Sequence, residues 1–119
     1  MTYVDGFVLP VPEKNLAAYL AVAKLAGEVW KEHGSLAYME CVADDVNTGV
    51  HTSFPQSVKL AADEVVVFSW IVFASRQERD RINAAVMTDP RIAELMCAEN
   101  MPFDGKRMIY GGFKTMVGM

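Results

Sequence analysis

The sequence has few of the residues that most often bind metals or perform covalent catalysis. Its 119 residues include two cysteines and two histidines. Cys41 and Cys97 are far apart and form no CxxC pair, and no spacing of histidines with cysteines is typical of a metal site. We therefore expect no metal, and we interpret both cysteines as small buried thiols in a reducing cytosol.

Motifs of well-known enzyme and membrane-protein classes are also missing. The chain has no phosphate-binding glycine loop, no GxGxxG, no HExxH and no GxSxG. It has no apolar run of about 18 residues, the length that crosses a bilayer. Its start, MTYVDGFVLP, has an early acid and lacks the basic region of a secretory signal peptide. A net charge of −4 argues against nucleic-acid binding. We expect a cytoplasmic protein with no membrane partner.

The composition is that of a globular protein. Apolar residues make up 52% of the chain and charged residues 22%. A chain of this length can bury a sizeable core without a metal or a disulfide. We therefore expect residues 1–119 to form a single domain.

The segment EVVVFSWIVFA at 64–74 is the most apolar part of the chain. Its β-branched and aromatic residues are typical of a strand. Successive strand residues point to opposite faces, so Phe68 and Trp70 should share one face. Val67 and Ile71 should share the other. This strand is therefore predicted to be buried on both faces.

Prolines, glycines and changes of period divide the rest of the chain into elements. Residues 13–33 have an apolar stripe at helical spacing. Ser75 and Glu78 form a capping box that starts a second helix, and Asp89 with Pro90 starts a third. We predict strands at 3–11, 36–43, 63–74 and 106–117, helices at 13–33, 76–87 and 90–96, and an irregular segment at 44–62.

The order β-α-β-β-α-β predicts a ferredoxin-like α+β fold with helices on one face of a four-stranded antiparallel sheet. The uncovered face would be unusually apolar for a monomer. We therefore expect a homodimer whose sheets pack face to face. Gly111 and Gly112 in the last strand indicate either a bulge or a close backbone approach.

Three segments make the sequence similar to a known family. These are YVDGFVLPVP near the start, SFPQSVKL in the middle and MPFDGKRMIYGGFKTMV near the end. They resemble the YbaA-like proteins, an uncharacterised bacterial family in the dimeric α+β barrel superfamily, over nearly the whole chain. The resemblance implies the fold and the dimer predicted above. It implies no function, since none is established for the family, and fold analogy alone does not supply one.

The wider superfamily includes cofactor-independent monooxygenases, haem-degrading enzymes, lactone isomerases and small stress proteins. The haem-degrading members use an asparagine, a tryptophan and a histidine that follows the third strand. Trp70 and Asn83 match part of this pattern, but no histidine follows residue 74. We therefore expect no haem and no other cofactor.

Asp5 is a carboxylate in the middle of the first predicted strand, between Val4 and Gly6. A carboxylate there is paired with a base, exposed at an edge, or part of a cavity lining. Glu40 and Arg107 lie on other strands of the same sheet and are its plausible partners. In a cavity, Asp5 would instead act as a general base.

Other candidate residues lie on the second and third strands and between them. Tyr38 and His51 are further weak catalytic candidates, although His51 in the irregular segment is also explained as a solvated loop histidine. The candidate ligand-binding residues are Phe68, Trp70 and Arg107. At such positions on a central strand, however, Phe68 and Trp70 are more often packing residues than a platform for a ligand.

These features leave three functional hypotheses. The first is a small homodimeric protein that binds a small apolar or aromatic molecule, with a default pocket between helices and sheet. The second is a cofactor-independent monooxygenase or isomerase whose pocket contains Asp5, Tyr38, His51 and Trp70. The third, an RNA-associated protein, is disfavoured by the acidic charge.

Overall fold

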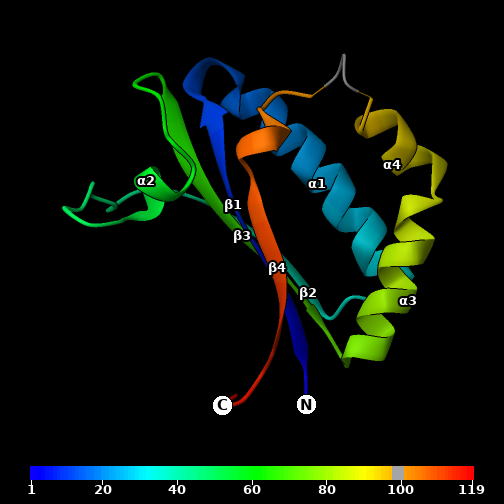
Figure 1. Cartoon of the computed structure of the whole chain (residues 1–119). Coiled ribbons are helices and arrows are strands. Elements are labelled where there is room, and N and C mark those ends of the chain that lie inside the picture. Colours follow the sequence, from blue (N-terminus) through cyan, green and yellow to red (C-terminus); the bar gives the residue numbers. More distant parts are fainter. Residues whose placement is uncertain (98–100) are drawn as a thin grey trace.

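A computed structural model describes residues 1–97 and 101–119 and shows an antiparallel sheet whose longer helices lie on one face (Figure 1). The four strands lie in the order β2-β3-β1-β4. The elements are β1 (Tyr3–Pro12), the 3-10 turn η1 (Glu13–Asn15), α1 (Leu16–His33), β2 (Ala37–Val42), α2 (Phe54–Ser57), β3 (Glu64–Phe73), α3 (Arg76–Met87), α4 (Pro90–Leu95), the 3-10 turn η3 (Gly105–Arg107) and β4 (Ile109–Lys114). The predicted ferredoxin-like α+β fold is confirmed.

Alternation along β3 places apolar side chains on both faces of the sheet, as its sequence predicts. Val67, Ile71 and Phe73 are almost fully buried and pack in clusters with residues of the helices. Phe68 and Trp70 lie on the opposite face, where Phe68 is 40% exposed. The helices of one chain therefore cover one face of β3 and leave part of the other open.

The segment 44–62, predicted to be irregular, contains the short helix α2 and packs onto the sheet. The Ser53 hydroxyl caps α2 by accepting a hydrogen bond from a backbone N–H one turn later. Val58 is almost fully buried and clusters with Val8 and Val66 on the face away from α1 and α3. This segment therefore covers one end of the face that the helices leave open.

The last strand, β4, is shorter than the sequence predicts. It begins at Ile109 rather than at 106, because the preceding residues form the turn η3. Asp104 caps this turn by accepting a hydrogen bond from the Lys106 backbone N–H at 3.0 Å. The strand ends at Lys114 rather than at 117.

Gly112 marks a close approach, and neither Gly111 nor Gly112 forms a bulge. The register of β4 against β1 is continuous through both glycines. A Cβ atom built on Gly112 would lie 2.5 Å from the Tyr3 hydroxyl oxygen and 2.7 Å from Arg79 Nη2. A larger residue at Gly112 would therefore displace the side chains that pack over it.

The helices α3 and α4 begin where the sequence predicts. The Ser75 hydroxyl accepts a hydrogen bond from the Glu78 backbone N–H at 3.1 Å. The Glu78 carboxylate pairs with Arg81 at 2.6 Å instead of returning to Ser75, so half of the expected capping box forms. Asp89 caps α4 and accepts a hydrogen bond from the Arg91 backbone N–H at 3.0 Å.

Asp5 is buried and connects the sheet to two helices. Arg79 on α3 donates hydrogen bonds from Nε to both carboxylate oxygens of Asp5, at 3.0 and 3.1 Å. Asn83 donates a further hydrogen bond to Asp5 at 3.1 Å. The Asn83 side-chain oxygen accepts one from the Trp30 indole N–H at 3.0 Å, which extends the network to α1. One carboxylate therefore joins β1, α3 and α1.

Asp5→Ala should lower the free energy of unfolding by about 3 kcal/mol, because it leaves the partly buried Arg79 charge and the Asn83 amide without their acceptor. Urea denaturation followed by circular dichroism measures this change. Asp45→Ala, in the exposed part of the segment 44–62, is the matched control and should alter stability by no more than about 0.5 kcal/mol. An unchanged midpoint for Asp5→Ala would contradict the structural role of this network.

Candidate functional site

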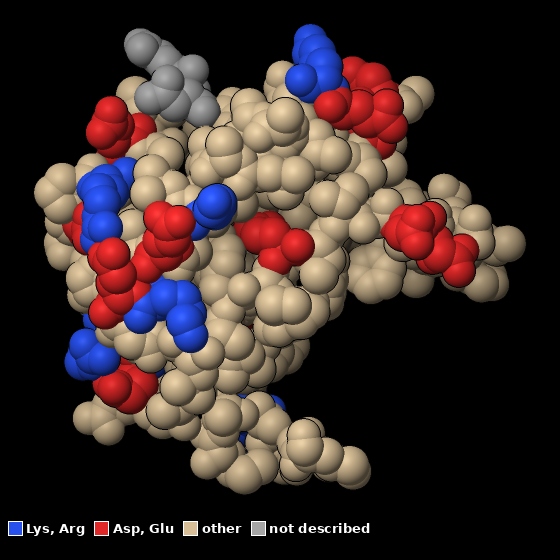
Figure 2. Space-filling view, turned by 180° about the vertical axis from the view of Figure 1, so that it is seen from behind, with Lys and Arg blue, Asp and Glu red and all other residues tan. Residues whose placement is uncertain are grey.

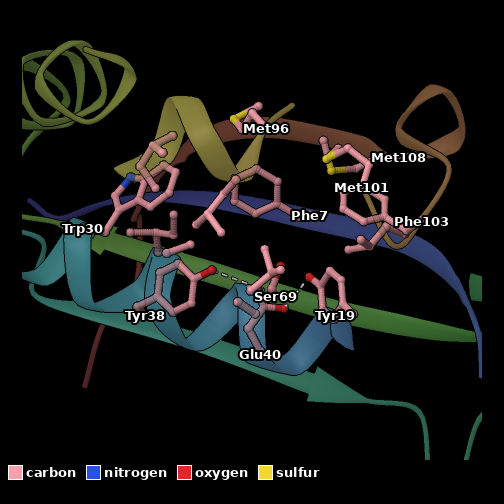
Figure 3. Close-up of a pocket in the computed structure, with 17 residues that line it drawn as sticks. Phe7, Tyr19, Trp30, Tyr38, Glu40, Ser69, Met96, Met101, Phe103 and Met108 are labelled. Carbon is pink, nitrogen blue, oxygen red and sulfur yellow. Dashed lines mark hydrogen bonds between the residues drawn. The ribbon is translucent and has the colours of Figure 1, made fainter. Parts of the chain in front are cut away.

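A cavity lies between the helices and the sheet (Figure 3). Its volume is about 160 Å³. Phe7 and Ile71 line it from the sheet, Trp30 lines it from α1, and Met96 and Met101 line it from the end of α4 and the chain that follows. The cavity therefore has a largely apolar, methionine-rich wall.

A polar cluster interrupts this apolar lining. It consists of Tyr19, Tyr38, Glu40 and Ser69, and we call it the Glu40 cluster. The Tyr19 hydroxyl donates a hydrogen bond to one carboxylate oxygen of Glu40 at 2.8 Å, and the Tyr38 hydroxyl donates to the other at 2.9 Å (Figure 3). Ser69 on β3 is buried and lies directly opposite Glu40 in the ladder with β2.

The local sequence explains how the Glu40 cluster forms. Tyr38 and Glu40 are two residues apart on β2, so both face the helices. Gly27 of α1 lies against the Tyr38 ring, and a Cβ atom built on it would be 2.7 Å from a ring carbon. A glycine at this position therefore lets α1 lie close to β2, where Tyr19 reaches Glu40.

Burial controls the protonation of the cluster. It raises the pKa of the Glu40 carboxyl above its ordinary value of 4.5, while the hydrogen bonds from Tyr19 and Tyr38 oppose part of this rise. Burial and the neighbouring Glu40 charge also raise the pKa of both tyrosines. The two hydroxyls therefore remain protonated at neutral pH and hold a carboxyl group that binds a proton more tightly than an exposed glutamate.

Glu40 also reaches the outside of the molecule. Together with Tyr38 it borders an outer groove along α1, whose other lining residues include Lys24, Glu28 and Lys31. On the sheet side this groove follows β2, which is an edge strand. The Glu40 carboxyl therefore lies between the apolar cavity and a groove that faces solvent.

Comparison with known proteins identifies the family. The chain matches the family model described as Protein of unknown function (DUF1428) over residues 2–105. The chain belongs to this family. It is 49% identical over 117 residues to the uncharacterized protein YbaA of Escherichia coli (strain K12), with 98% of each chain covered, and YbaA of Shigella flexneri gives the same values. The resemblance to the YbaA-like proteins is confirmed.

Solved structures support the fold of this DUF1428 chain at low sequence identity. Rv0793 from Mycobacterium tuberculosis has a TM-score of 0.55 and 10% identity, covering 99% of this chain and 98% of its own. A NIPSNAP family protein with unknown function from Agrobacterium tumefaciens has a TM-score of 0.55 and 17% identity, covering 96% and 87%. These likenesses confirm the predicted fold class.

The structure does not bring the sequence-predicted catalytic residues into one pocket. Tyr38 lines the cavity, as part of the Glu40 cluster. Asp5 instead binds Arg79 and Asn83 of α3, and neither of its predicted partners is bonded to it. His51 is exposed in the segment between β2 and β3. The enzyme hypothesis rested on these residues sharing a pocket, and the structure does not support that premise.

The predicted ligand-binding residues also lie outside this cavity. Phe68 and Trp70, whose rings are 5.5 Å apart, line a hollow on the opposite face of the sheet. Arg107 binds Glu64 at 2.6 Å and Asp104 at 2.9 Å, and so fixes η3 to the start of β3. These side chains have packing and ion-pair roles in the single chain.

Glu40 is the central residue of the site, and sequence reasoning missed its role. The predicted strand at 36–43 already placed it on the same face as Tyr38. The register that sets Ser69 opposite it, and the position of α1 that brings Tyr19 to it, are not visible in the local pattern. Glu40 was therefore interpreted as a partner of Asp5 instead of as the centre of a separate cluster.

The predicted burial of both cysteines is wrong. Cys97 is exposed, and Cys41 is only partly buried because it lies on the edge strand β2.

Neither a metal cluster nor a membrane-spanning helix occurs in the described part of the chain. Within 1–97 and 101–119, no group of three or more His, Cys, Asp or Glu side chains is placed to hold a metal ion. The helices of this part of the chain are all too short or too polar to cross a membrane.

Glu40→Gln should change how stability depends on pH. Because the Glu40 pKa is raised by folding, the folded state binds this proton more tightly than the unfolded state does. The contribution of Glu40 to stability is therefore fully present below its unfolded pKa and is lost as pH rises through the raised value. The free energy of unfolding of the wild type, minus that of the variant, should decrease as pH rises from about 4.5 through the raised Glu40 pKa.

Urea denaturation at a series of pH values measures this difference. Glu13→Gln, on the exposed turn η1, controls for the general effect of removing a carboxyl group. A difference that stays constant or increases with pH would mean that Glu40 is not held in the environment described here.

Proposed function

We propose that this protein is a homodimer that binds a small apolar or aromatic molecule in the cavity between its helices and sheet. The observation that supports this function is an apolar cavity with the Glu40 cluster in its wall. Ligand sites are typically apolar, with a few polar groups that orient the ligand. The aromatic and methionine side chains provide the apolar contacts, and Glu40 provides the orientation.

The volume of the cavity limits the size of the ligand. The cavity measures about 160 Å³. An engineered apolar cavity of about 150 Å³ in another protein binds benzene. One six-membered ring with a small substituent therefore fits. The flexible side chains of Met96, Met101 and Met108 allow the wall to adjust to small differences in shape.

The Glu40 cluster favours a ligand with one hydrogen-bonding group. The tyrosine hydroxyls already donate to Glu40, and the Trp30 indole N–H already donates to Asn83. Each oxygen of the Glu40 carboxylate has a second lone pair, and the Ser69 hydroxyl takes no part in the two tyrosine hydrogen bonds. A ring hydroxyl or carbonyl therefore has a partner at this point of the wall.

A second copy of the chain is the partner that best suits the open face of the sheet. Phe68, Trp70, Ile109 and Phe113 border a hollow of about 630 Å³ on this face. Phe113 is 65% exposed there. These four residues are uncharged, so a two-fold copy would meet the same apolar surface without burying an unpaired charge. Face-to-face packing of two sheets would cover both copies.

The charged residues lie mainly elsewhere on the molecule. Figure 2 shows acidic and basic side chains mixed over the helical side. Ion pairs such as Arg91 with Glu32 at 2.7 Å and Arg81 with Glu78 at 2.6 Å account for this mixture. Phosphate backbones are bound by clustered, available cations. The pairing of charges therefore supports a small-molecule ligand over RNA.

The free thiols of Cys41 and Cys97 support a reducing, cytoplasmic location.

In a titration with one-ring compounds, p-cresol should bind at least about tenfold more tightly than toluene. The reason is that its hydroxyl donates a hydrogen bond to the half-buried Glu40 carboxylate, and about 1.4 kcal/mol corresponds to a factor of ten. Isothermal titration calorimetry measures both affinities. Glu40→Leu should remove the preference for p-cresol.

Filling the cavity provides the second half of this test. Ala26→Leu places extra atoms in the cavity and should abolish binding, while Ala18→Leu, on the exposed side of α1, should leave it unchanged. Equal affinity of the two variants for p-cresol would show that the ligand binds elsewhere or not specifically.

Phe68→Glu should convert the proposed dimer to a folded monomer, because it places an unpaired charge in each copy of the apolar interface. Size-exclusion chromatography with light scattering measures the mass, and circular dichroism checks the fold. Leu25→Glu makes the same change on the outer side of α1 and should leave the dimer intact. A wild-type chain that is monomeric at all accessible concentrations would contradict the dimer proposal.

A further inference from the structure

The geometry of Glu40 suits a group that accepts a proton from a bound molecule. Its two carboxylate oxygens each accept one tyrosine hydrogen bond, which fixes the plane of the carboxylate. One lone pair on each oxygen remains available. The carboxylate therefore has a set orientation and retains the capacity to take a proton from a ligand in the cavity.

The surroundings strengthen Glu40 as a base. Apolar side chains around it disfavour its ionised form, which raises its pKa and increases its affinity for a proton. A ring bound against the apolar wall displaces water from that part of the cavity. These are the conditions in which a carboxylate can remove a weakly acidic proton from carbon.

Ser69 supplies a hydrogen-bond donor for the negative charge that such a step creates. It lies opposite Glu40 in the β2–β3 ladder and lines the same cavity. Its hydroxyl takes no part in the hydrogen bonds that Tyr19 and Tyr38 make to Glu40. A carbonyl oxygen bound between Glu40 and Ser69 would therefore have a hydroxyl donor available as it becomes an oxyanion.

We propose that this cavity catalyses the movement of a double bond in a one-ring β,γ-unsaturated ketone, with Glu40 as the proton carrier. Glu40 takes the proton from the carbon between the carbonyl and the double bond, and the C–H electron pair moves to form a dienolate. Ser69 donates a hydrogen bond to the dienolate oxygen. The protonated Glu40 then gives the proton to the γ carbon, and the conjugated ketone forms with no net oxidation or reduction. This inference rests on the proposed ligand-binding function.

The outer groove gives the proton on Glu40 a route to solvent. Because Glu40 lies between the cavity and this groove, the proton that it holds can exchange with solvent. A reaction run in D₂O should therefore yield product that contains deuterium at the γ carbon. The uncatalysed solvent reaction is subtracted with a protein-free sample.

The test uses cyclohex-3-en-1-one, whose ring has the size that the cavity accepts. The full-length protein should convert it to cyclohex-2-en-1-one, which is measured by the ultraviolet absorbance of the conjugated product. Glu40→Gln should reduce kcat by at least about 100-fold, because general-base catalysis contributes about 100- to 10,000-fold. Glu13→Gln, on the exposed turn η1, should retain the wild-type rate.

Two further measurements separate chemistry from folding. Ser69→Ala should lower kcat by about 100-fold with little change in KM, because its hydroxyl acts on the oxyanion and contributes less to binding of the ground state. The wild-type kcat should fall as pH decreases through the raised Glu40 pKa, with a midpoint above 4.5. Circular dichroism confirms that each variant is folded.

Binding without turnover and failure to bind have different meanings. Saturation-transfer NMR with cyclohexanone, which has the ring and carbonyl but no double bond to move, reports binding alone. Binding of cyclohexanone with no conversion of the unsaturated ketone would overturn the proton-transfer inference and leave the binding function intact. Absence of binding by both ketones and by p-cresol would overturn both. A Glu40→Gln rate equal to wild type would overturn the role of Glu40.

Discussion

The two-sided burial of β3 is the constraint on which the rest of the fold depends. This strand is hydrogen-bonded to β1 on one side and to β2 on the other, so its polar backbone is satisfied within the sheet. Its side chains are apolar on both faces and require cover on both. The helices supply that cover on one face, while α2 and its flanking loop supply part of it on the other. The proposed dimer follows from the part that remains open.

Two carboxylates on the helix-facing side of this sheet show how the surroundings set the role of an acidic residue. Asp5 lies on β1 and meets the guanidinium of Arg79, which neutralises its charge and joins α3 to the sheet. Glu40 lies on β2 and meets the hydroxyls of Tyr19 and Tyr38. Hydroxyls satisfy the oxygens of a carboxylate without neutralising it, so burial raises the affinity of Glu40 for a proton. Asp5 therefore has a structural role, while Glu40 can still bind and release a proton.

The cavity and the Glu40 cluster form where the helix layer meets an edge of the sheet. Gly27 allows α1 to lie against Tyr38, and Ile92, Met96 and Met101 line the other side. A half-buried carboxylate beside an unfilled volume lowers stability relative to a well-packed apolar core. Features of this kind are expected at functional sites, where local packing is weaker than the fold alone would favour.

Local sequence patterns determined most of the secondary structure, the faces of β3 and the fold class, because periodicity and capping act over a few residues. They did not predict α2 or the shorter extent of β4. They also placed Tyr38 and Glu40 on one face of a strand. The partners of each carboxylate were decided by tertiary structure. Arg79 and Asp5 bind each other although they are 74 positions apart in the chain, and Tyr19 on α1 binds Glu40 on β2. Such contacts depend on strand register and helix position, which arise from packing of the whole chain.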